Sequence, residues 1–311
     1  MFDLAALNAA VAAHRRVARV VIAAVAGSSP REVGAAMLVW ADGQSGTIGG
    51  GALEFQAAAR ARKMLAAGGQ RFEREALGPA LGQCCGGAVG LFTEVFGAAE
   101  LAALHGPVIA RAVAGGEMPL AVKRILAAAR GQGVIPAPAL IQGWMVEPVL
   151  EPHRNLWIWG AGHVGRALVA VLAPLPGFAI TWVDVAQNRF PDALPAGVKI
   201  LPVPDPGLAV ALAPKVAEHL ILTFSHALDL DLCHRLLNHG FQYLGLIGSA
   251  TKWARFRSRL AALGHAPETI ARINCPIGDP ALGKHPQAIA IGVAAALLRP
   301  TVALSRSAER H

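Results

Sequence analysis

The sequence lacks the patterns of a membrane-spanning or secreted protein. Hydrophobic residues make up 54% of its 311 positions. Charged residues, glycines and prolines nevertheless interrupt every apolar run well before the roughly 18 residues that a membrane-spanning helix needs. The first residues, Met1 to Leu4, contain neither a basic segment nor a small-residue cleavage site. We therefore expect no membrane span, no secretory signal and a cytoplasmic location.

Cysteines and catalytic patterns are also scarce. The four cysteines, Cys84, Cys85, Cys233 and Cys275, form no C-x-x-C pair, and the adjacent two cannot easily form an ordinary disulfide with each other. The sequence shows no Walker A motif, no helical His/Glu metal triad and no serine or cysteine beside a positioned base. These absences favour free thiols over disulfides and a binding protein over an enzyme, with no catalytic residue assigned.

Acidic residues are outnumbered by basic ones, 20 against 28, so the net charge at pH 7 is +8. This excess permits an anionic partner. The lysines and arginines are scattered, however, and no basic stripe is interleaved with aromatic residues in the way that is typical of nucleic-acid-binding proteins. We therefore expect no nucleic acid partner.

The chain is organised around residues 160–165, which contain the glycine pattern G-x-G-x-x-G. They follow an apolar run at 156–159 and precede a segment of alternating apolar residues at 166–173, which indicates a strand, a turn and a helix start. The glycines let the backbone turn tightly and approach a phosphate, and the N-terminus of the helix attracts that phosphate. The motif therefore predicts a phosphate-bearing ligand.

A second predicted strand, at 179–183, supports this interpretation. It ends in Asp184, 19 residues after Gly165, where a ribose-binding carboxylate is expected. The alternative is a domain of the same shape that binds nothing or a different ligand. The predicted ligand contacts in this half of the chain are Gly160, Gly162, Gly165 and Asp184.

The first half of the chain mixes helix and strand patterns. Residues 120–126 could form a further strand. Four prolines between 136 and 152 disfavour regular helices and strands in that segment. We therefore place a domain boundary near residue 150. The predicted helices cover 2–15 and 52–67, and the predicted strands cover 17–26, 35–40, 71–77, 88–96 and 108–113.

The second half alternates strands with helices, which implies a parallel, doubly wound sheet. The predicted fold class is α/β, with an N-terminal α/β domain at 1–150 and a C-terminal Rossmann-like domain at 151–311. The strands after residue 184 are expected at 198–201, 219–224 and 243–247, and the helices at 208–213, 228–239, 251–263 and 286–298.

Two adjacent thiols lie in a glycine-rich loop of the first half. Cys84 and Cys85 precede Gly86 and Gly87, so both are sterically open and could present thiolate sulfur to a soft metal such as molybdenum, copper or zinc. The alternative is a pair of packed small hydrophobes, since cysteine is often buried.

A second candidate anion site lies nearby in the sequence. Arg31 and Ser29, together with Gly50 and Gly51 at a helix start, could hold an anion through a guanidinium, a hydroxyl and backbone N–H groups. The alternative is a capped helix and a solvated arginine.

Histidine and carboxylates also follow a predicted strand of the second half. The carboxyl end of the sheet, where ligands of such folds bind, is the expected place of His226, Asp229 and Asp231. The two aspartates could equally serve to charge the N-terminus of the following helix.

Taken together, seven ordered motifs resemble the XdhC/CoxI family over nearly the whole chain. They lie at residues 27–31, 49–54, 83–87, 160–165, 225–229, 246–249 and 275–278. The resemblance is strongest to the members that serve xanthine dehydrogenase. It implies an N-terminal XdhC/CoxI domain and a C-terminal Rossmann-like domain, and a chaperone that binds the molybdenum cofactor, Mo-molybdopterin, as cargo.

The resemblance also implies partners and a contact residue. The cofactor would be held while a cysteine desulfurase supplies sulfur and would then be delivered to apo-xanthine dehydrogenase. Cys85 is the expected contact to the cofactor, reaching its molybdenum, and Cys84 is the second candidate. After Asp184 the chain departs from the family pattern, which places an arginine-containing stretch there. A homodimer is one of the oligomeric states that the sequence leaves open.

Two other functions remain as alternatives. The fingerprint with Asp184, taken alone, fits an NAD-dependent oxidoreductase, although no proton-transfer residue with a clear partner accompanies it. Cys84 and Cys85, taken alone, fit a copper or zinc carrier. Bound pterin, bound metal or NADH turnover would distinguish the three.

Overall fold

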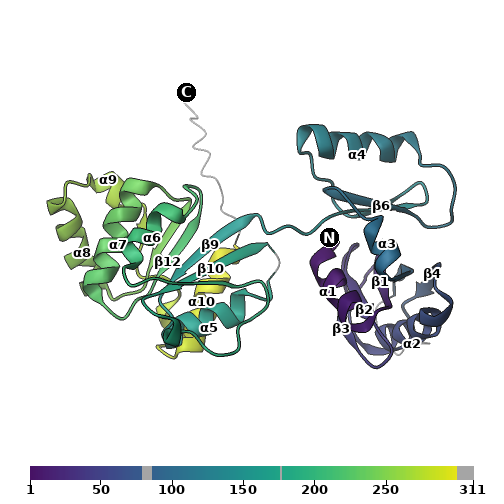
Figure 1. Cartoon of the computed structure of the whole chain (residues 1–311), viewed down its shortest axis with the longest axis horizontal. Helices are drawn as coiled ribbons and strands as arrows, with labels where there is room; N and C mark the ends of the chain where they lie inside the picture. Colours follow the sequence, from purple (N-terminus) through teal and green to yellow (C-terminus); the bar gives the residue numbers. More distant parts are fainter. Residues whose placement is uncertain (79–85, 176, 300–311) are drawn as a thin grey trace. The chain divides into compact units, whose positions relative to one another are not determined.

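The computed structural model describes residues 1–78, 86–175 and 177–299. The chain divides into two compact units, Met1–Glu151 and Pro152–His311, which we call the N-terminal and the C-terminal unit (Figure 1). Each unit has its own hydrophobic core.

The N-terminal unit is built around strand β1 (Val17–Ala26), a run rich in valine, which favours a buried strand. β1 is the central strand of a five-stranded antiparallel sheet of order β3-β2-β1-β5-β4. A second antiparallel sheet has the order β6-β8-β7. The other strands are β2 (Ala36–Val39), β3 (Gln44–Gly46), β4 (Gln70–Ala76), β5 (Ala88–Phe96), β6 (Val108–Ala112), β7 (Ala139–Ile141) and β8 (Trp144–Pro148), and the helices are α1 (Leu4–His14), α2 (Gly51–Ala67), α3 (Ala98–Ala102) and α4 (Leu120–Gln132).

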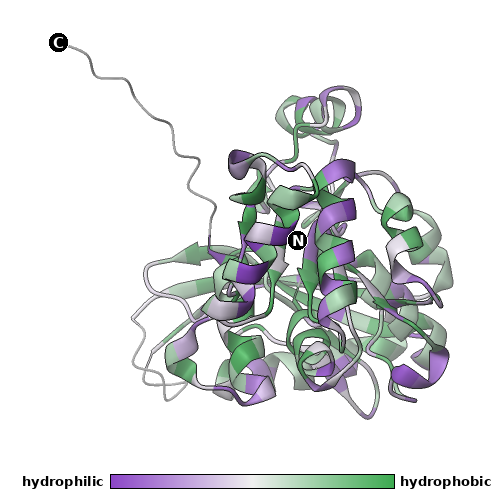
Figure 2. Cartoon of the chain, turned by 90° about the vertical axis from the view of Figure 1, so that its left-hand side faces the viewer, coloured by the Kyte–Doolittle hydropathy of each residue, from purple (hydrophilic) through white to green (hydrophobic). Residues whose placement is uncertain are grey.

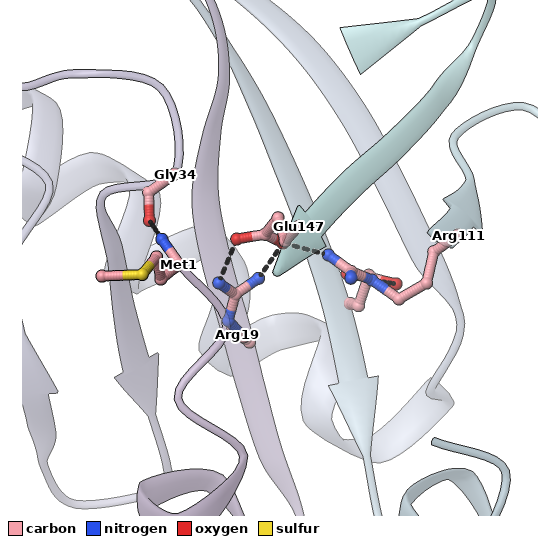
Figure 3. A network of polar contacts seen from close by, with 6 residues as sticks. Met1, Arg19, Gly34, Arg111 and Glu147 are labelled. Carbon is pink, nitrogen blue, oxygen red and sulfur yellow. Dashed lines mark hydrogen bonds and ion pairs between the residues drawn. The ribbon is translucent and has the colours of Figure 1, made fainter. Parts of the chain in front are cut away.

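Alternate residues of β1 point to opposite faces of its sheet. Val20 and Ile22 pack with Leu53 of α2 in one cluster. On the other face, Arg19 forms a bidentate ion pair with Glu147 of β8, with N–O distances of 3.0 and 2.7 Å (Figure 3). Helix α2 therefore covers one face of the large sheet, and a charge contact joins the other face to the small sheet.

The buried charges form a network that extends beyond this pair. Glu147 also accepts from Arg111 of β6, which donates in addition to Glu94 of β5. All four side chains are less than a tenth exposed. Burial by itself raises the pKa of Glu147, but the guanidinium groups of Arg19 and Arg111 outweigh it and hold that pKa below its ordinary value.

The prediction of a strand at 120–126 is wrong, because the structure forms helix α4 there. Val122, Ile125, Leu126 and Ala129 lie against one small core cluster, and their spacing of three and four residues is helical. Gly133 ends the helix in the left-handed conformation, with φ +67°.

The proline-containing segment that follows is also more regular than expected. Strands β7 and β8 form a hairpin there. Its turn residues, Gln142 and Gly143, have φ values of +48° and +80°, as a tight two-residue hairpin turn requires.

The C-terminal unit contains a six-stranded, all-parallel sheet of order β11-β10-β9-β12-β13-β14. Numbered by their order along this unit, the strands have the order 3-2-1-4-5-6 of a dinucleotide-binding sheet. The strands are β9 (Arg154–Trp159), β10 (Phe178–Asp184), β11 (Lys199–Pro202), β12 (Glu218–Ile221), β13 (Tyr243–Leu246) and β14 (Ile273–Asn274), and the helices are α5 (His163–Leu172), α6 (Pro206–Ala209), α7 (His226–His239), α8 (Ala250–Ala262), α9 (Pro267–Ile270) and α10 (Pro286–Leu298), with short 3-10 turns at η2 (Gln187–Arg189), η3 (Val210–Leu212) and η4 (Pro280–Leu282).

Both faces of this sheet are covered. Trp157 and Trp159 of β9 pack in a cluster with residues of α7 and α8, whereas Leu156 and Ile158 pack in a second cluster with residues of α5 and α10. The helices nearest the viewer in Figure 2 carry both hydrophilic and hydrophobic residues, as helices on a sheet face do. The sheet is therefore doubly wound.

The α/β fold class and the Rossmann-like C-terminal sheet are thus confirmed. Within the described part of the chain, no helix is both long enough and apolar enough to cross a membrane.

Candidate functional site

The candidate site lies at the carboxyl ends of β9, β10 and β12. The sheet grows outward in opposite directions from the boundary between β9 and β12, and ligands of open α/β sheets bind at such a reversal point. The glycine turn that follows β9 leads into α5, and the loops that follow β10 and β12 lie on either side of it (Figure 1).

Two fingerprint glycines are required by the fold itself. A Cβ on Gly160, whose φ is +121°, would lie 2.4 Å from the carbonyl oxygen of Leu222. A Cβ on Gly165 would lie 2.0 Å from the carbonyl oxygen of Gly160. Both distances are far below van der Waals contact, so close packing of α5 on the strands explains these glycines without a ligand.

Gly162 has no such structural explanation. It is the N-cap of α5, with φ −73° and ψ −173°, which is extended backbone that any residue adopts. Apart from its neighbours along the chain, a Cβ there would meet no other atom of residues 1–78, 86–175 and 177–299 within 4 Å. Among the described residues no side chain caps this helix, and its first turn contains no acidic residue. The position is therefore open to an anion, which the helix dipole favours.

Asp184 is placed beside the glycine turn, but its carboxylate is already engaged. The side chain is only 4% exposed. One oxygen accepts from the N–H of Ala161 at 2.5 Å, and the other accepts from the N–H of Val185 at 2.7 Å and lies 3.4 Å from Nε of Arg189. In this arrangement Asp184 fixes the turn, and its predicted contact to a ribose stays a prediction.

Asp229 has a comparable positioning role. It is buried and accepts from the N–H and the hydroxyl of Thr223 and from Nζ of Lys252 at 2.6 Å. It therefore ties the loop after β12 to the start of α8. Asp231 pairs instead with Arg235 on the helix surface, so the structure does not gather the two aspartates into one site.

The glycine-rich helix start of the N-terminal unit differs from that of α5. Glu54, in the first turn of α2, accepts from the Thr47 hydroxyl at 2.5 Å and from the N–H groups of Ile48 and Gly50 at 3.0 and 3.1 Å. Burial alone raises the pKa of Glu54, but these hydrogen bonds outweigh it and lower that pKa. The Gly50 N–H, which was predicted to bind an anion, thus already donates to a carboxylate of the chain itself. Gly51 is the first residue of the helix.

Three motifs of the N-terminal unit meet in space. A Cβ on Gly49 would lie 2.6 Å from Cβ of Pro30, and a Cβ on Gly87 would lie 2.1 Å from the carbonyl oxygen of Ser28. The segment that follows the two thiols therefore packs against residues 27–30, and the helix start of α2 packs against the same turn.

The remaining predicted contacts of this unit have different surroundings. The Ser29 hydroxyl donates to the Arg31 carbonyl oxygen at 2.8 Å. Arg31 forms an exposed bidentate pair with Glu32, and a Cβ on Gly86 would meet nothing within 4 Å. Cys84 and Cys85 lie outside the described residues. Within the described ranges no group of three or more His, Cys, Asp or Glu residues could hold a metal ion.

The groups that close or complete these sites are not among the residues predicted from the sequence. Glu54 could have been recognised, because an acidic residue in the first turn after a glycine run is a capping signal. The contact between Lys252 and Asp229 joins helices that follow different strands, β13 and β12. Sequence spacing provides no signal for such contacts.

Comparisons with known proteins agree with this architecture. The model of the XdhC and CoxI family matches residues 10–75, and the model of the XdhC Rossmann domain matches residues 156–297. The second model covers most of the C-terminal unit, and the first covers less than half of the N-terminal unit.

Two individual proteins are similar to this chain. The uncharacterized protein YqeB of Escherichia coli (strain K12) is 32% identical over 146 residues, which are 47% of this chain and 27% of that protein, so the chain spans about a quarter of that relative. A crystal structure described as a xanthine dehydrogenase from Bacillus halodurans has a TM-score of 0.71, with 96% of this chain and 95% of that chain covered. At 22% identity, this second likeness shows the fold alone.

Proposed function

Because the chain belongs to the XdhC and CoxI family, we propose that it is an accessory protein of xanthine dehydrogenase. It binds the molybdenum cofactor as cargo and holds it while a cysteine desulfurase replaces the terminal oxo ligand with sulfur. It then delivers the cofactor to apo-xanthine dehydrogenase. The protein itself performs no turnover.

The observation that carries this proposal is the open start of α5. Gly162 is the fingerprint glycine with no steric reason to be glycine, and the helix N-terminus beside it has no internal carboxylate among the described residues. Molybdopterin carries a terminal phosphate, which such a helix start attracts. Gly162 is therefore the candidate phosphate contact of the C-terminal unit.

The N-terminal unit contributes a separate candidate contact. By resemblance to the family, Cys85 is the residue that reaches the cofactor, with Cys84 second. Thiolate sulfur is a suitable ligand for a soft metal centre. The convergence of Gly87 with Ser28, and of Gly49 with Pro30, supports a common role for these motifs. Replacing Cys85 and Cys84 singly by alanine should weaken cofactor binding more for Cys85.

The direct test is reconstitution of molybdenum-free xanthine dehydrogenase with dilute cofactor and a sulfur donor. We expect a higher rate and yield of active, sulfurated dehydrogenase when this protein is present. Equal rate and yield without it would contradict the proposal. Protein recovered before transfer should contain molybdenum and a pterin that becomes fluorescent on oxidation, in equal amounts.

The strand order 3-2-1-4-5-6 with a glycine fingerprint supports a second candidate, an NAD-dependent oxidoreductase. Against it, the carboxylate of Asp184 is committed to the turn. Turnover of NADH by the purified protein would favour this candidate. Stoichiometric copper or zinc without pterin would instead favour a metal carrier.

A further inference from the structure

An exposed aromatic ring lies at the carboxyl edge of the C-terminal sheet. Phe224 follows β12 and is 66% exposed, although a phenylalanine in a folded protein normally buries most of its surface. The guanidinium carbon of Arg189 lies 5.3 Å from the centre of its ring. The ring is therefore covered only in part, and by a planar cation.

The two residues reach this contact from opposite sides of the glycine turn. Arg189 belongs to η2 after β10, and Phe224 lies in the loop after β12. These strands flank β9, from which the glycine turn emerges. Arg166 fixes the arrangement, since its guanidinium donates to the carbonyl oxygens of Ala161 at 3.2 Å and Arg189 at 2.8 Å.

The guanidinium of Arg189 retains capacity for a ligand. Its Nε is buried 3.4 Å from Asp184 and has no properly oriented acceptor within the described residues, so the exposed part of the guanidinium is what a ligand can meet. The side chain is 40% exposed. A partly exposed guanidinium that stacks on an aromatic ring can still hold an anion or a ring edge through its exposed nitrogens.

Asp184 also restricts the class of ligand. Asp184 is 4% exposed and each of its oxygens accepts from a backbone N–H, so little of the carboxylate is presented to a ribose diol. We therefore expect ring stacking to contribute to recognition beside the phosphate position.

We propose that Phe224 and Arg189 form a ring subsite for the fused nitrogen heterocycle of a phosphate-bearing ligand. The heterocycle stacks on Phe224, the guanidinium contacts its edge or its phosphate, and the phosphate lies toward Gly162. A pterin and an adenine share this chemistry. The assignment of the ring to a pterin rests on the proposed function, whereas the subsite itself does not.

The experiment measures binding of a pterin monophosphate, AMP and NADH to the full chain by calorimetry. Phe224→Ala should weaken binding of the recognised probe about tenfold, since one stacked base contributes roughly this much. Phe224→Trp should restore it, because a larger aromatic face is retained. Arg189→Gln should weaken it as well and reduce its salt dependence.

Phe55 provides a matched control, because it is 77% exposed and lies on α2 of the other unit. Phe55→Ala should leave binding unchanged. Stacking that depends on Phe224 supports the subsite, and the preferred probe identifies the source of the ring. Absence of binding by every probe, or equal affinity of Phe224→Ala and wild type, would overturn it. Reconstitution of the dehydrogenase tests the proposed function separately, so the two can fail independently.

Discussion

The two glycine-rich helix starts of this protein look alike in sequence and differ in what they leave open. At α2, the carboxylate of Glu54 accepts from Thr47, Ile48 and Gly50, so the chain supplies its own anion. At α5, the first turn contains no acidic residue, and no atom of the described residues, its chain neighbours apart, lies within 4 Å of a Cβ placed on Gly162. We therefore expect a glycine-to-helix junction to bind an external anion only where no internal carboxylate fills it.

The largest effect should come from the glycine that packs α5 on its sheet. Gly165→Ala would place a Cβ 2.0 Å from the Gly160 carbonyl oxygen, which forces helix and turn apart. We expect a loss of about 3 kcal/mol in the free energy of unfolding of the C-terminal unit. Urea denaturation followed by hydrogen exchange measures it. A change below about 1 kcal/mol would show that the junction is loosely packed.

The next largest effect should come from acid, which should lower the stability of the two units to different extents. Burial, followed by the charge of His239, lowers the pKa of His219 to about 3. Since the unfolded value is near 6.5, the unfolded state binds the extra proton, and stability falls as pH decreases from about 6.5 toward 3. The C-terminal unit should lose about 2 kcal/mol between pH 6.5 and 5.

The N-terminal junction should keep its stability over that pH range. The lowered pKa of Glu54 means that its contribution is present above about pH 4.5 and is lost only as pH falls further. Hydrogen exchange resolved by unit measures both responses. His219→Gln, which retains an acceptor for the Trp159 indole N–H, should abolish the early loss. Equal acid sensitivity of that variant and wild type would contradict the assignment.

Removing the internal carboxylate should make the first junction resemble the second. Glu54→Ala leaves the N–H groups of Ile48 and Gly50 without their acceptor. We expect a loss of about 1 kcal/mol in the unfolding free energy of the N-terminal unit. Glu54→Gln, which keeps a neutral acceptor, should lose less. Equal losses in the two variants would mean that the charge of Glu54, and not its capacity to accept hydrogen bonds, stabilises the junction, whereas no loss in either variant would contradict a stabilising role for Glu54.

The smallest effect on stability is expected when the helix start of α5 is given an internal carboxylate like that of α2. Gly162→Asp introduces an N-cap carboxylate at extended backbone with free space around it. It should raise the unfolding free energy by about 0.5 kcal/mol. Destabilisation by more than about 1 kcal/mol would show that the space beside Gly162 is not available to a side chain.

The sequence predicted most elements because local patterns decide them. The valine-rich run of β1 and the alternation of strands and helices after residue 154 are local signals, and the structure follows them. The prediction at residues 120–126 is wrong because seven apolar-rich residues fit a strand as well as the first half of α4. Only Ala129, one helical turn further on, makes the period clear.

The candidate site could be predicted only in part. The fingerprint located the turn, but its glycines have different roles that depend on the carbonyl oxygens of Leu222 and Gly160. Arg19 and Glu147, 128 positions apart, form a buried pair that no spacing rule indicates. Contacts between loops and between sheets therefore could not be predicted from the sequence.

The account rests on the open junction at Gly162, and cofactor loading tests it most directly. The measurement is the amount of molybdenum and of oxidised pterin retained per protein after equilibration with the cofactor, for wild type, Gly162→Asp and Gly162→Asn. The two substitutions have nearly the same volume and both cap the helix, so they differ in charge. The account predicts near-normal loading of Gly162→Asn and at least tenfold weaker loading of Gly162→Asp. Equal, wild-type loading of both variants would contradict it.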